Sequence, residues 1–482
     1  MMRFKSYAAM GLAVGLVACG GATKDLKAPT HPSGKTDRSG HKVSKAAARS
    51  FNTALDSFVS HDKASDWSES VCKDVAGQFL HASKQQKGET NRALPEAIYN
   101  AGLVYQRCDD DAGAKKEFQA ALDVDKKFYR AQAQLVLYDY QKNHNLDGTI
   151  SQLEQTIRAA HFQLVGGLVS LAALQMERGN DTPNSDGKND LERAKLNLQR
   201  ALAIDDSYMP AFNQLAIYYM ELAKAKAEKK KGSGRSHRRS LQVAGAQRAE
   251  VDKQQLDLAA LVASQAIKKN PTYAPIYNTA GLIQVELKNF NGAVKNFGRA
   301  RKLDPKFFEA DMNYAAVSLG FRGFKEAERA YRDALKLHPN EYEAHLGLAL
   351  ALRGGINDAN WDKNVAEAQK ELDKAQKLEP NRPETYYNEA ILTQEYKAKS
   401  GSGDAIPMLE KAADLYGQFI SKAGTGAQFA EAVKRSKDRE QDIRDTVKFI
   451  KEGKASKAAQ DKANAAAAKS SAGSTKPAAP KK

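Results

Sequence analysis

The chain has 482 residues, of which 42% are hydrophobic, and its formal net charge at pH 7 is +16. This length permits a sizeable buried core. The sequence contains no HExxH, no GxSxG and no glycine-rich phosphate loop, so we expect neither an enzyme nor a bound cofactor. It also lacks a cluster of His and Cys with metal-ligand spacing, so we expect no metal.

The positive charge is concentrated in two segments. Residues 224–253 hold ten Lys or Arg and three acidic residues, and residues 454–482 hold seven Lys and one Asp. Neither contains Phe, Tyr or Trp, whereas nucleic-acid-binding domains carry charge on a folded face or interleave it with aromatic side chains. We therefore expect no nucleic-acid partner. For residues 224–253 two interpretations remain open: contact with anionic lipid, lipopolysaccharide or peptidoglycan, or a solvated loop between two helices.

Residues 1–18 have the layout of a secretory signal peptide. Positive charge at Arg3 and Lys5 precedes an apolar run, residues 8–17, which is too short to cross a bilayer because that takes about 20 residues. The run ends in Leu-Val-Ala-Cys, which resembles the lipobox of bacterial lipoproteins. The resemblance implies cleavage before Cys19, lipid attachment at its thiol, and sorting to the periplasmic face of the outer membrane, because Gly20 and not Asp follows. The alternative is an ordinary secretory signal in which the cysteine has no role.

Two further N-terminal segments differ in composition. Residues 19–43 are rich in Gly, Lys, Ser, Thr, Pro and His, so we expect a flexible tether after the lipidated cysteine. Residues 44–93 contain two stretches with apolar residues at helical spacing, 46–58 and 67–80. They predict a helical pair that caps the N-terminal end of the following region.

The most informative pattern is a repeat with a period of 34 residues. One copy consists of Ala293, Phe297, Ala300 and Pro305, and the next of Ala327, Tyr331, Ala334 and Pro339. Small residues on one helix face let a neighbouring helix approach, the large residue fills the space beside them, and proline ends the helix. This spacing resembles the second helix of a tetratricopeptide repeat. The resemblance implies an all-α, right-handed superhelical solenoid, preceded by the signal and tether and followed by a disordered C-terminal tail.

Residues 94–423 accommodate about eight such helix pairs, interrupted by a basic, disordered insertion at 224–253. Weaker copies of the second-helix spacing are Ala194, Leu198, Ala201 and Ala405, Leu409, Ala412. Residues 424–453 predict a charged C-terminal capping helix, and residues 454–482 predict a low-complexity Ala/Lys/Pro tail.

Cys72 and Cys108 fall in neighbouring predicted helix pairs. In an oxidising periplasm they can form a disulfide, and the alternative is two separately buried thiols. Sequence alone does not supply the geometry that decides between these two states.

A tetratricopeptide array offers a concave face, lined by its first helices, that suits a peptide or a partner helix. By resemblance, the groove positions here are Asn213, Ile217, Asn278, Leu282, Met312, Leu346, Leu350, Tyr387 and Ile391. They lack the paired Lys and Asn with which chaperone-binding members of the family hold a terminal carboxylate. For each position, packing between neighbouring repeats is the alternative interpretation.

The lipobox, the long array and the Ala-Lys-Pro tail together resemble the outer-membrane tetratricopeptide lipoproteins of the myxobacterial adventurous gliding machinery. This resemblance implies a scaffold in a trans-envelope complex, with an outer-membrane β-barrel and periplasmic motility proteins as partners. Two alternatives remain open. One is a pilotin-like lipoprotein for assembly of the type IV pilus secretin. Proteins of that kind resemble this chain less closely, because their arrays are shorter and lack a long basic insertion. The other is an accessory scaffold for peptidoglycan enzymes.

Overall fold

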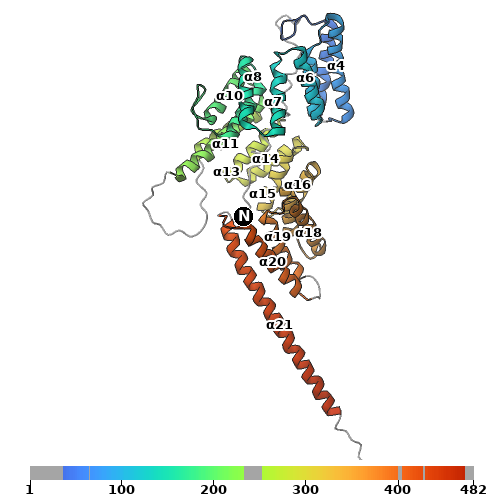
Figure 1. Ribbon diagram of the computed structural model, residues 1–482, viewed down its shortest axis with the longest axis vertical. Helices are drawn as coiled ribbons and strands as arrows, with labels where there is room; N and C mark the ends of the chain where they lie inside the picture. Colours follow the sequence, from blue (N-terminus) through green and yellow to red (C-terminus); the bar gives the residue numbers. More distant parts are fainter. Residues whose placement is uncertain (1–35, 65, 233–251, 400–403, 427–428, 473–482) are drawn as a thin grey trace, which may run out of the picture. The chain divides into compact units, whose positions relative to one another are not determined.

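The computed structural model describes residues 36–64, 66–232, 252–399, 404–426 and 429–472 (Figure 1). Apart from two isolated β-bridges, the regular secondary structure in these ranges is helical. The fold is the all-α tetratricopeptide solenoid that the sequence predicts. None of the described helices combines the length and apolar character needed to cross a membrane. The chain divides into two compact units, residues 1–313 and 314–482.

The first unit is built from consecutive helix pairs. Within each pair the two helices pack together, and the second helix of one pair then packs on the first helix of the next, as α4 does on α5 and α6 on α7. The helices are α3 Lys45–Ala64, α4 Glu69–Thr90, α5 Pro95–Arg107, α6 Asp111–Val124, α7 Tyr129–Asn143, α8 Leu146–Ala159, α9 Val165–Arg178, α10 Asp190–Ile204, α11 Met209–Gly232, α12 Lys253–Lys269, α13 Ala274–Glu286 and α14 Phe290–Leu303. Helix α15, Phe308–Gly320, crosses the boundary between the units.

The second unit continues the alternation of first and second helices. Each helix from α16 onward packs against its successor, and α20 packs against the C-terminal helix α21. The helices are α16 Phe324–Leu337, α17 Tyr342–Gly354, α18 Trp361–Leu378, α19 Pro383–Glu395, a short 3-10 turn Lys397–Lys399, α20 Ile406–Ala423 and α21 Ala430–Ala472.

The predicted second-helix positions form the contact between the helices of a pair. Ala293, Phe297 and Ala300 on α14 have no exposed surface. Opposite them, Gly281 on α13 lies so close to the Phe297 ring that an ideal Cβ at this position would be 2.4 Å from the ring Cε1. Carbon atoms normally approach to about 3.5 Å. Glycine is therefore what allows the two helices to close on the aromatic ring.

Several second helices begin with the same cap, which the sequence analysis did not recognise. The side chains of Asp110, Asn145 and Asn289 accept a hydrogen bond from the backbone N–H of a glycine three residues later, at 2.8, 3.0 and 3.1 Å. This bond satisfies one of the free N–H groups of the first helical turn. A Cβ at each glycine would lie within 2.7 Å of the capping side chain, so the two residues form a matched pair.

Residues 36–43 are bonded to α4 and α5, whereas the sequence predicts a flexible tether over residues 19–43. The backbone N–H of Arg38 donates to Glu96 Oε1 at 3.0 Å, and that of Ser44 donates to Gln86 Oε1 at 2.8 Å. Gln86 Nε2 in turn donates to the carbonyl oxygen of Lys42 at 2.8 Å. These bonds pair backbone groups of a segment that has few large apolar side chains to bury. We call residues 36–44 the N-terminal strap.

The C-terminal helix is longer than predicted. Helix α21 continues to Ala472, whereas the sequence analysis ended the capping helix at residue 453 and began a disordered tail at residue 454. Residues 451–466 are exposed and rich in Ala and Lys, which have a high helix propensity. The remaining tail, residues 473–482, lies outside the described residues.

The basic insertion is shorter in the structure than predicted. Helix α11 continues to Gly232, so its last turns fall within the segment that the sequence analysis assigned to an insertion at 224–253. Helix α12 begins at Lys253. Residues 233–251 lie outside the described residues.

The last helix pair has a different register from the predicted one. Ala405 is the residue before α20, and Leu409 is only half-buried. The tightly buried positions are Ala412, Tyr416 and Phe419, each at most 1% exposed. The predicted register is therefore wrong by seven residues. Seven residues are about two helical turns, so both registers lie on the same helix face, and spacing alone does not separate them.

Candidate partner-binding surface

Most of the predicted groove residues are buried. Among the nine, side chains no more than 8% exposed belong to Asn213, Ile217, Asn278, Leu282, Met312 and Leu346. A partner that approached the array would not reach these side chains without local opening. At these positions the structure favours the alternative interpretation, packing between neighbouring repeats.

The buried groove amides connect consecutive first helices of the first unit. Thr279 Oγ1 on α13 donates to Asn213 Oδ1 on α11 at 2.7 Å. Asn313 Nδ2 on α15 donates to Asn278 Oδ1 on α13 at 2.9 Å. Because an unpaired buried amide is costly, each bond favours one register between neighbouring pairs. These polar side chains position the repeats.

The other three predicted groove residues are half-buried and lie in the second unit. Leu350 is on α17, and Tyr387 and Ile391 are on α19. The Tyr387 ring packs 5.0 Å from the ring of Phe419, measured between centroids, so one side of it is held by α20. This part of the first-helix face is apolar, partly accessible and supported from behind.

Two arginines that the sequence analysis did not identify stand beside these residues. Arg353, one turn after Leu350, donates from Nη1 to the carbonyl oxygen and to Oδ1 of Asn388 at 3.2 and 3.1 Å. Arg439 on α21 donates from Nη1 to Gln394 Oε1 at 2.9 Å and to Glu395 Oε1 at 3.1 Å. First helices α17 and α19 and the capping helix α21 thus supply one continuous surface.

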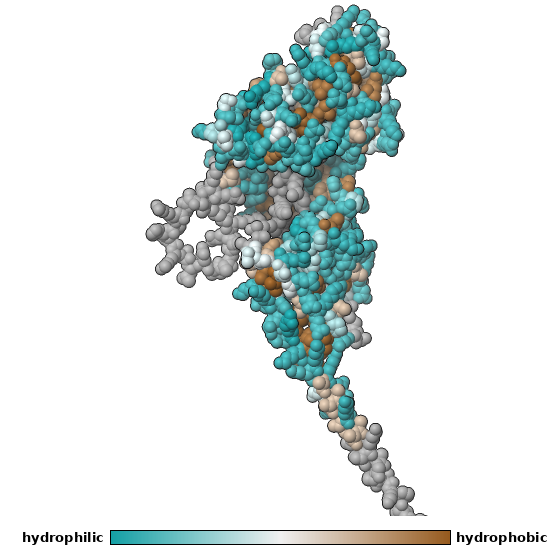
Figure 2. Space-filling model, viewed as in Figure 1, coloured by the Kyte–Doolittle hydropathy of each residue, from teal (hydrophilic) through white to brown (hydrophobic). Residues whose placement is uncertain are grey.

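We call this surface the arginine face; it comprises Leu350, Arg353, Tyr387, Ile391 and Arg439, and the buried Asn388 lies beneath it as the partner of Arg353. Burial lowers the pKa of Arg353, and the charge of Arg439 lowers it further, although three tyrosines oppose this shift. One of them, Tyr416, donates to Gln394 and accepts from Arg439, and burial raises its pKa to about 12. The face therefore combines apolar side chains, one phenol and two guanidinium groups. Figure 2 shows a largely hydrophilic surface with smaller hydrophobic patches.

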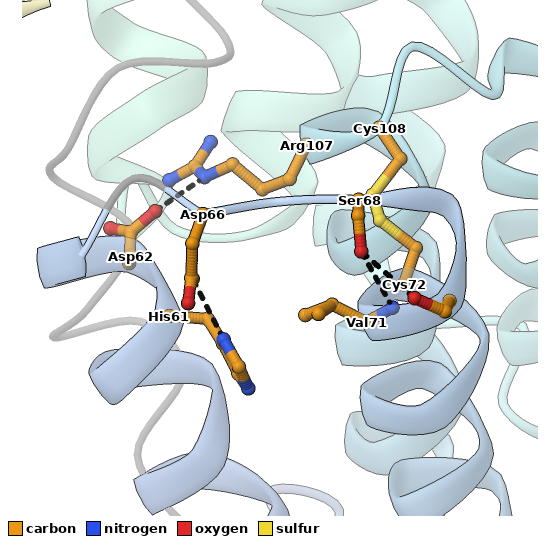
Figure 3. Close-up of a disulfide and its surroundings, with 9 residues drawn as sticks. His61, Asp62, Asp66, Ser68, Val71, Cys72, Arg107 and Cys108 are labelled. Atoms are coloured by element: carbon orange, nitrogen blue, oxygen red, sulfur yellow. Dashed lines mark hydrogen bonds and ion pairs between the residues drawn. A yellow bond between two sulfur atoms is a disulfide. The ribbon is translucent and has the colours of Figure 1, made fainter.

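A disulfide ties the N-terminal cap to the next helix pair (Figure 3). Cys72 lies in the first turn of α4, and Cys108 directly follows α5, with their Cα atoms 6.4 Å apart. This separation lies within the usual range of about 4.4–6.8 Å. Beside the disulfide, Arg107 Nε donates to Asp62 Oδ1 on α3 at 2.8 Å. Of the two states left open by the sequence, the structure has the bonded one.

Other predicted features are not placed by the structure. The signal peptide, Cys19 and most of the tether lie outside the described residues. No group of three or more His, Cys, Asp and Glu side chains in the described ranges could hold a metal ion.

The fold and the first-helix face define a class of protein, a tetratricopeptide-repeat solenoid of the kind that presents surface to protein partners. A family profile described as tetratricopeptide repeat matches residues 95–128, the segment of α5 and α6. Over 109 residues the chain is 29% identical to stress-induced-phosphoprotein 1 of Caenorhabditis elegans, a match that covers 23% of this chain. The chain spans 34% of the length of that relative.

Solved structures with a similar arrangement include a thermophilic tetratricopeptide protein of Thermus thermophilus. It is 21% identical, with a TM-score of 0.37, and the match covers 47% of this chain and 99% of that chain. Pseudomonas aeruginosa PilF is 17% identical, with a TM-score of 0.38, and the match covers 56% of this chain and 96% of that chain. The assignment of the fold rests on the matched repeat and on the helix pairs themselves.

Proposed function

We propose that this protein is a non-catalytic scaffold that binds protein partners and is held by a lipid anchor at the periplasmic face of the outer membrane. The observation that carries the scaffold role is the arginine face, a partly accessible part of the first-helix surface. Repeat arrays bind partners along such extended surfaces, and the rest of the described chain consists of repeat pairs, caps and the strap.

The anchor and compartment rest on two features. The Leu-Val-Ala-Cys sequence at residues 16–19 supports lipid attachment at Cys19. The disulfide between Cys72 and Cys108 supports an oxidising compartment, because such bonds are rare where thiols are kept reduced. Several acyl chains on one cysteine give firm attachment, whereas a single chain binds only marginally.

Within this role, the system that the whole-chain resemblance favours is a trans-envelope gliding machine. Its partners would be an outer-membrane β-barrel and periplasmic motility proteins. The basic segment 224–253 would add a contact with peptidoglycan or lipopolysaccharide, since it carries a local excess of Lys and Arg.

The proposal is tested by crosslinking in cells, recovery of the protein under denaturing conditions, and mass spectrometry of what is attached. Recovery of an outer-membrane β-barrel with motility proteins is the expected result. Recovery of a secretin would instead indicate a function in pilus assembly. The matched control is Cys19→Ala, which should leave a soluble or precursor form. If Cys19→Ala protein remained in the outer membrane, the lipid anchor would be refuted.

A further inference from the structure

The arginine face carries an excess of positive charge that the fold does not neutralise. Arg353 makes no ion pair with a carboxylate among the described residues; its hydrogen bonds go to Asn388. Arg439 pairs with Glu395, which also pairs with Lys399 at 3.3 Å. The carboxylate of Glu395 therefore pairs with two cations, and among the described residues no carboxylate pairs with Arg353.

The other carboxylates on α19 are already paired elsewhere. Glu384 lies 3.1 Å from Arg382, and Glu389 lies 3.1 Å from Lys411. Helix α19 therefore has no further carboxylate that could pair with Arg353. A half-buried guanidinium without a counter-ion is an unfavourable state, which a carboxylate brought in from outside would relieve.

The neighbouring side chains suit a peptide better than a small free anion. Leu350 and Ile391 offer apolar contact on the two first helices, and Tyr387 adds an aromatic ring that Phe419 holds in place. A bound carboxylate alone would leave these apolar surfaces in water. A segment with acidic and apolar residues would cover both kinds of surface.

We propose that the arginine face binds a peptide segment of a partner protein through a carboxylate, which Arg353 and Arg439 receive while flanking apolar residues pack on Leu350, Tyr387 and Ile391. This inference rests on the proposed scaffold function and names the chemistry of its partner. The carboxylate is the side chain of an Asp or Glu residue in the partner segment. Because Arg439 belongs to α21, the capping helix completes the binding surface as well as closing the array.

The probe is a library of random dodecapeptides displayed on phage, selected in parallel on the full-length protein and on its Arg353→Gln variant. Peptides selected by the unaltered protein should be enriched in acidic residues, and the variant should lose this enrichment. A charged hydrogen bond lost from a partly buried site should weaken binding of a selected peptide about ten- to a hundredfold. Arg353→Lys keeps the charge but not the planar fork, so it should restore binding only in part.

The matched control is Arg435→Gln on the same helix as Arg439. Arg435 is 54% exposed and lies 3.9 Å from Glu431, so this variant should select the same peptides as the unaltered protein. Thermal unfolding by circular dichroism establishes that each variant is folded. If Arg353→Gln unfolds the chain, the same comparison is made with Arg439→Gln, whose arginine is 36% exposed.

Selected peptides are then synthesised with their acidic side chains changed to the amides, Glu to Gln and Asp to Asn, and separately with an amidated C-terminus. Loss of binding when the acidic side chains are changed supports the proposal, whereas loss only on amidation of the C-terminus would overturn it. Peptides that bind without any acidic preference, or equally well to Arg353→Gln, would overturn the carboxylate site but leave the scaffold function standing. Failure to select any peptide would count against both.

Discussion

Replacement of Asp190 by Asn should destabilise the first unit strongly, because this carboxylate is the centre of a buried ionic cluster. The side chain of Asp190 has no exposed surface. One oxygen accepts from Arg178 Nε at 2.7 Å and from the backbone N–H of Asn180 at 2.8 Å. The other accepts from Arg178 Nη2 at 2.8 Å and from Arg193 at 3.0 and 2.5 Å.

The size of the effect follows from these bonds. An amide keeps only one acceptor oxygen, so Asp190→Asn loses at least two of the five bonds and places an N–H group against other donors. It also leaves Arg193, which is 3% exposed, without its carboxylate. Removing one member of a buried ion pair costs about 3–5 kcal/mol. We therefore expect a loss of about 3–5 kcal/mol in the free energy of unfolding.

The pH dependence has a defined sign. Burial alone would raise the pKa of Asp190, but the hydrogen bonds from Arg178 and Arg193 outweigh it and lower that pKa. A carboxyl group with a lowered pKa contributes stability that is fully present above the pKa of the unfolded chain, about 3.9. That contribution is lost as the pH falls through the lower, folded-state pKa. Asp190→Asn should therefore make unfolding less dependent on pH in the acidic range.

The assay is urea unfolding followed by circular dichroism, with hydrogen exchange to locate the effect in α9 and α10. The control is Asp186→Asn in the loop that precedes α10, where the carboxylate is 32% exposed and 3.5 Å from Arg200. An exposed pair of this kind contributes at most about 1 kcal/mol. If both variants lowered the free energy of unfolding by the same amount, the buried cluster would not stabilise the first unit more than an exposed ion pair does, and our reasoning would be refuted.

Two further predictions concern the cap and the helix contacts. Replacing both Cys72 and Cys108 by Ala should lower stability by about 4 kcal/mol, from the chain entropy of a closed loop with a sequence separation of 36; equal urea midpoints with and without the disulfide would contradict this. Gly77→Ala, where an added Cβ meets nothing within 4 Å, should stabilise α4 by about 1 kcal/mol. Gly281→Ala should instead destabilise by about 1–3 kcal/mol through its clash with Phe297, and thermal melts that moved in the same direction for both glycines would show the helix contact to be wrong.

The repeat could be predicted from sequence because its spacing has a steric cause. Two helices can pack closely here only if the side chains at 293, 297 and 300 are small, large and small. The pattern Ala293, Phe297, Ala300 therefore indicates the helix contact itself. The same reasoning failed for Ala405 and Leu409, because a shift of seven residues preserves the helix face while changing which turns are buried.

The binding surface was only partly predictable. Leu350, Tyr387 and Ile391 follow from the first-helix pattern, but their degree of burial depends on how neighbouring pairs pack. Arg353 and Arg439 are 86 residues apart in sequence, and each alone is typical of a solvated helix face. Only the packing of α19 and α21 shows that they belong to one surface.

The N-terminal strap bears on how the protein would carry a mechanical load. Under the proposed lipid anchor, tension applied from the N-terminal side would reach the strap before it reached α3. There the strap is bonded to Gln86 on α4 and Glu96 on α5, and not to α3 alone. Force would enter two helices that a disulfide also joins, so the terminal helix would not be peeled away first. The strap and the disulfide would thus spread such a load over the first two helix pairs.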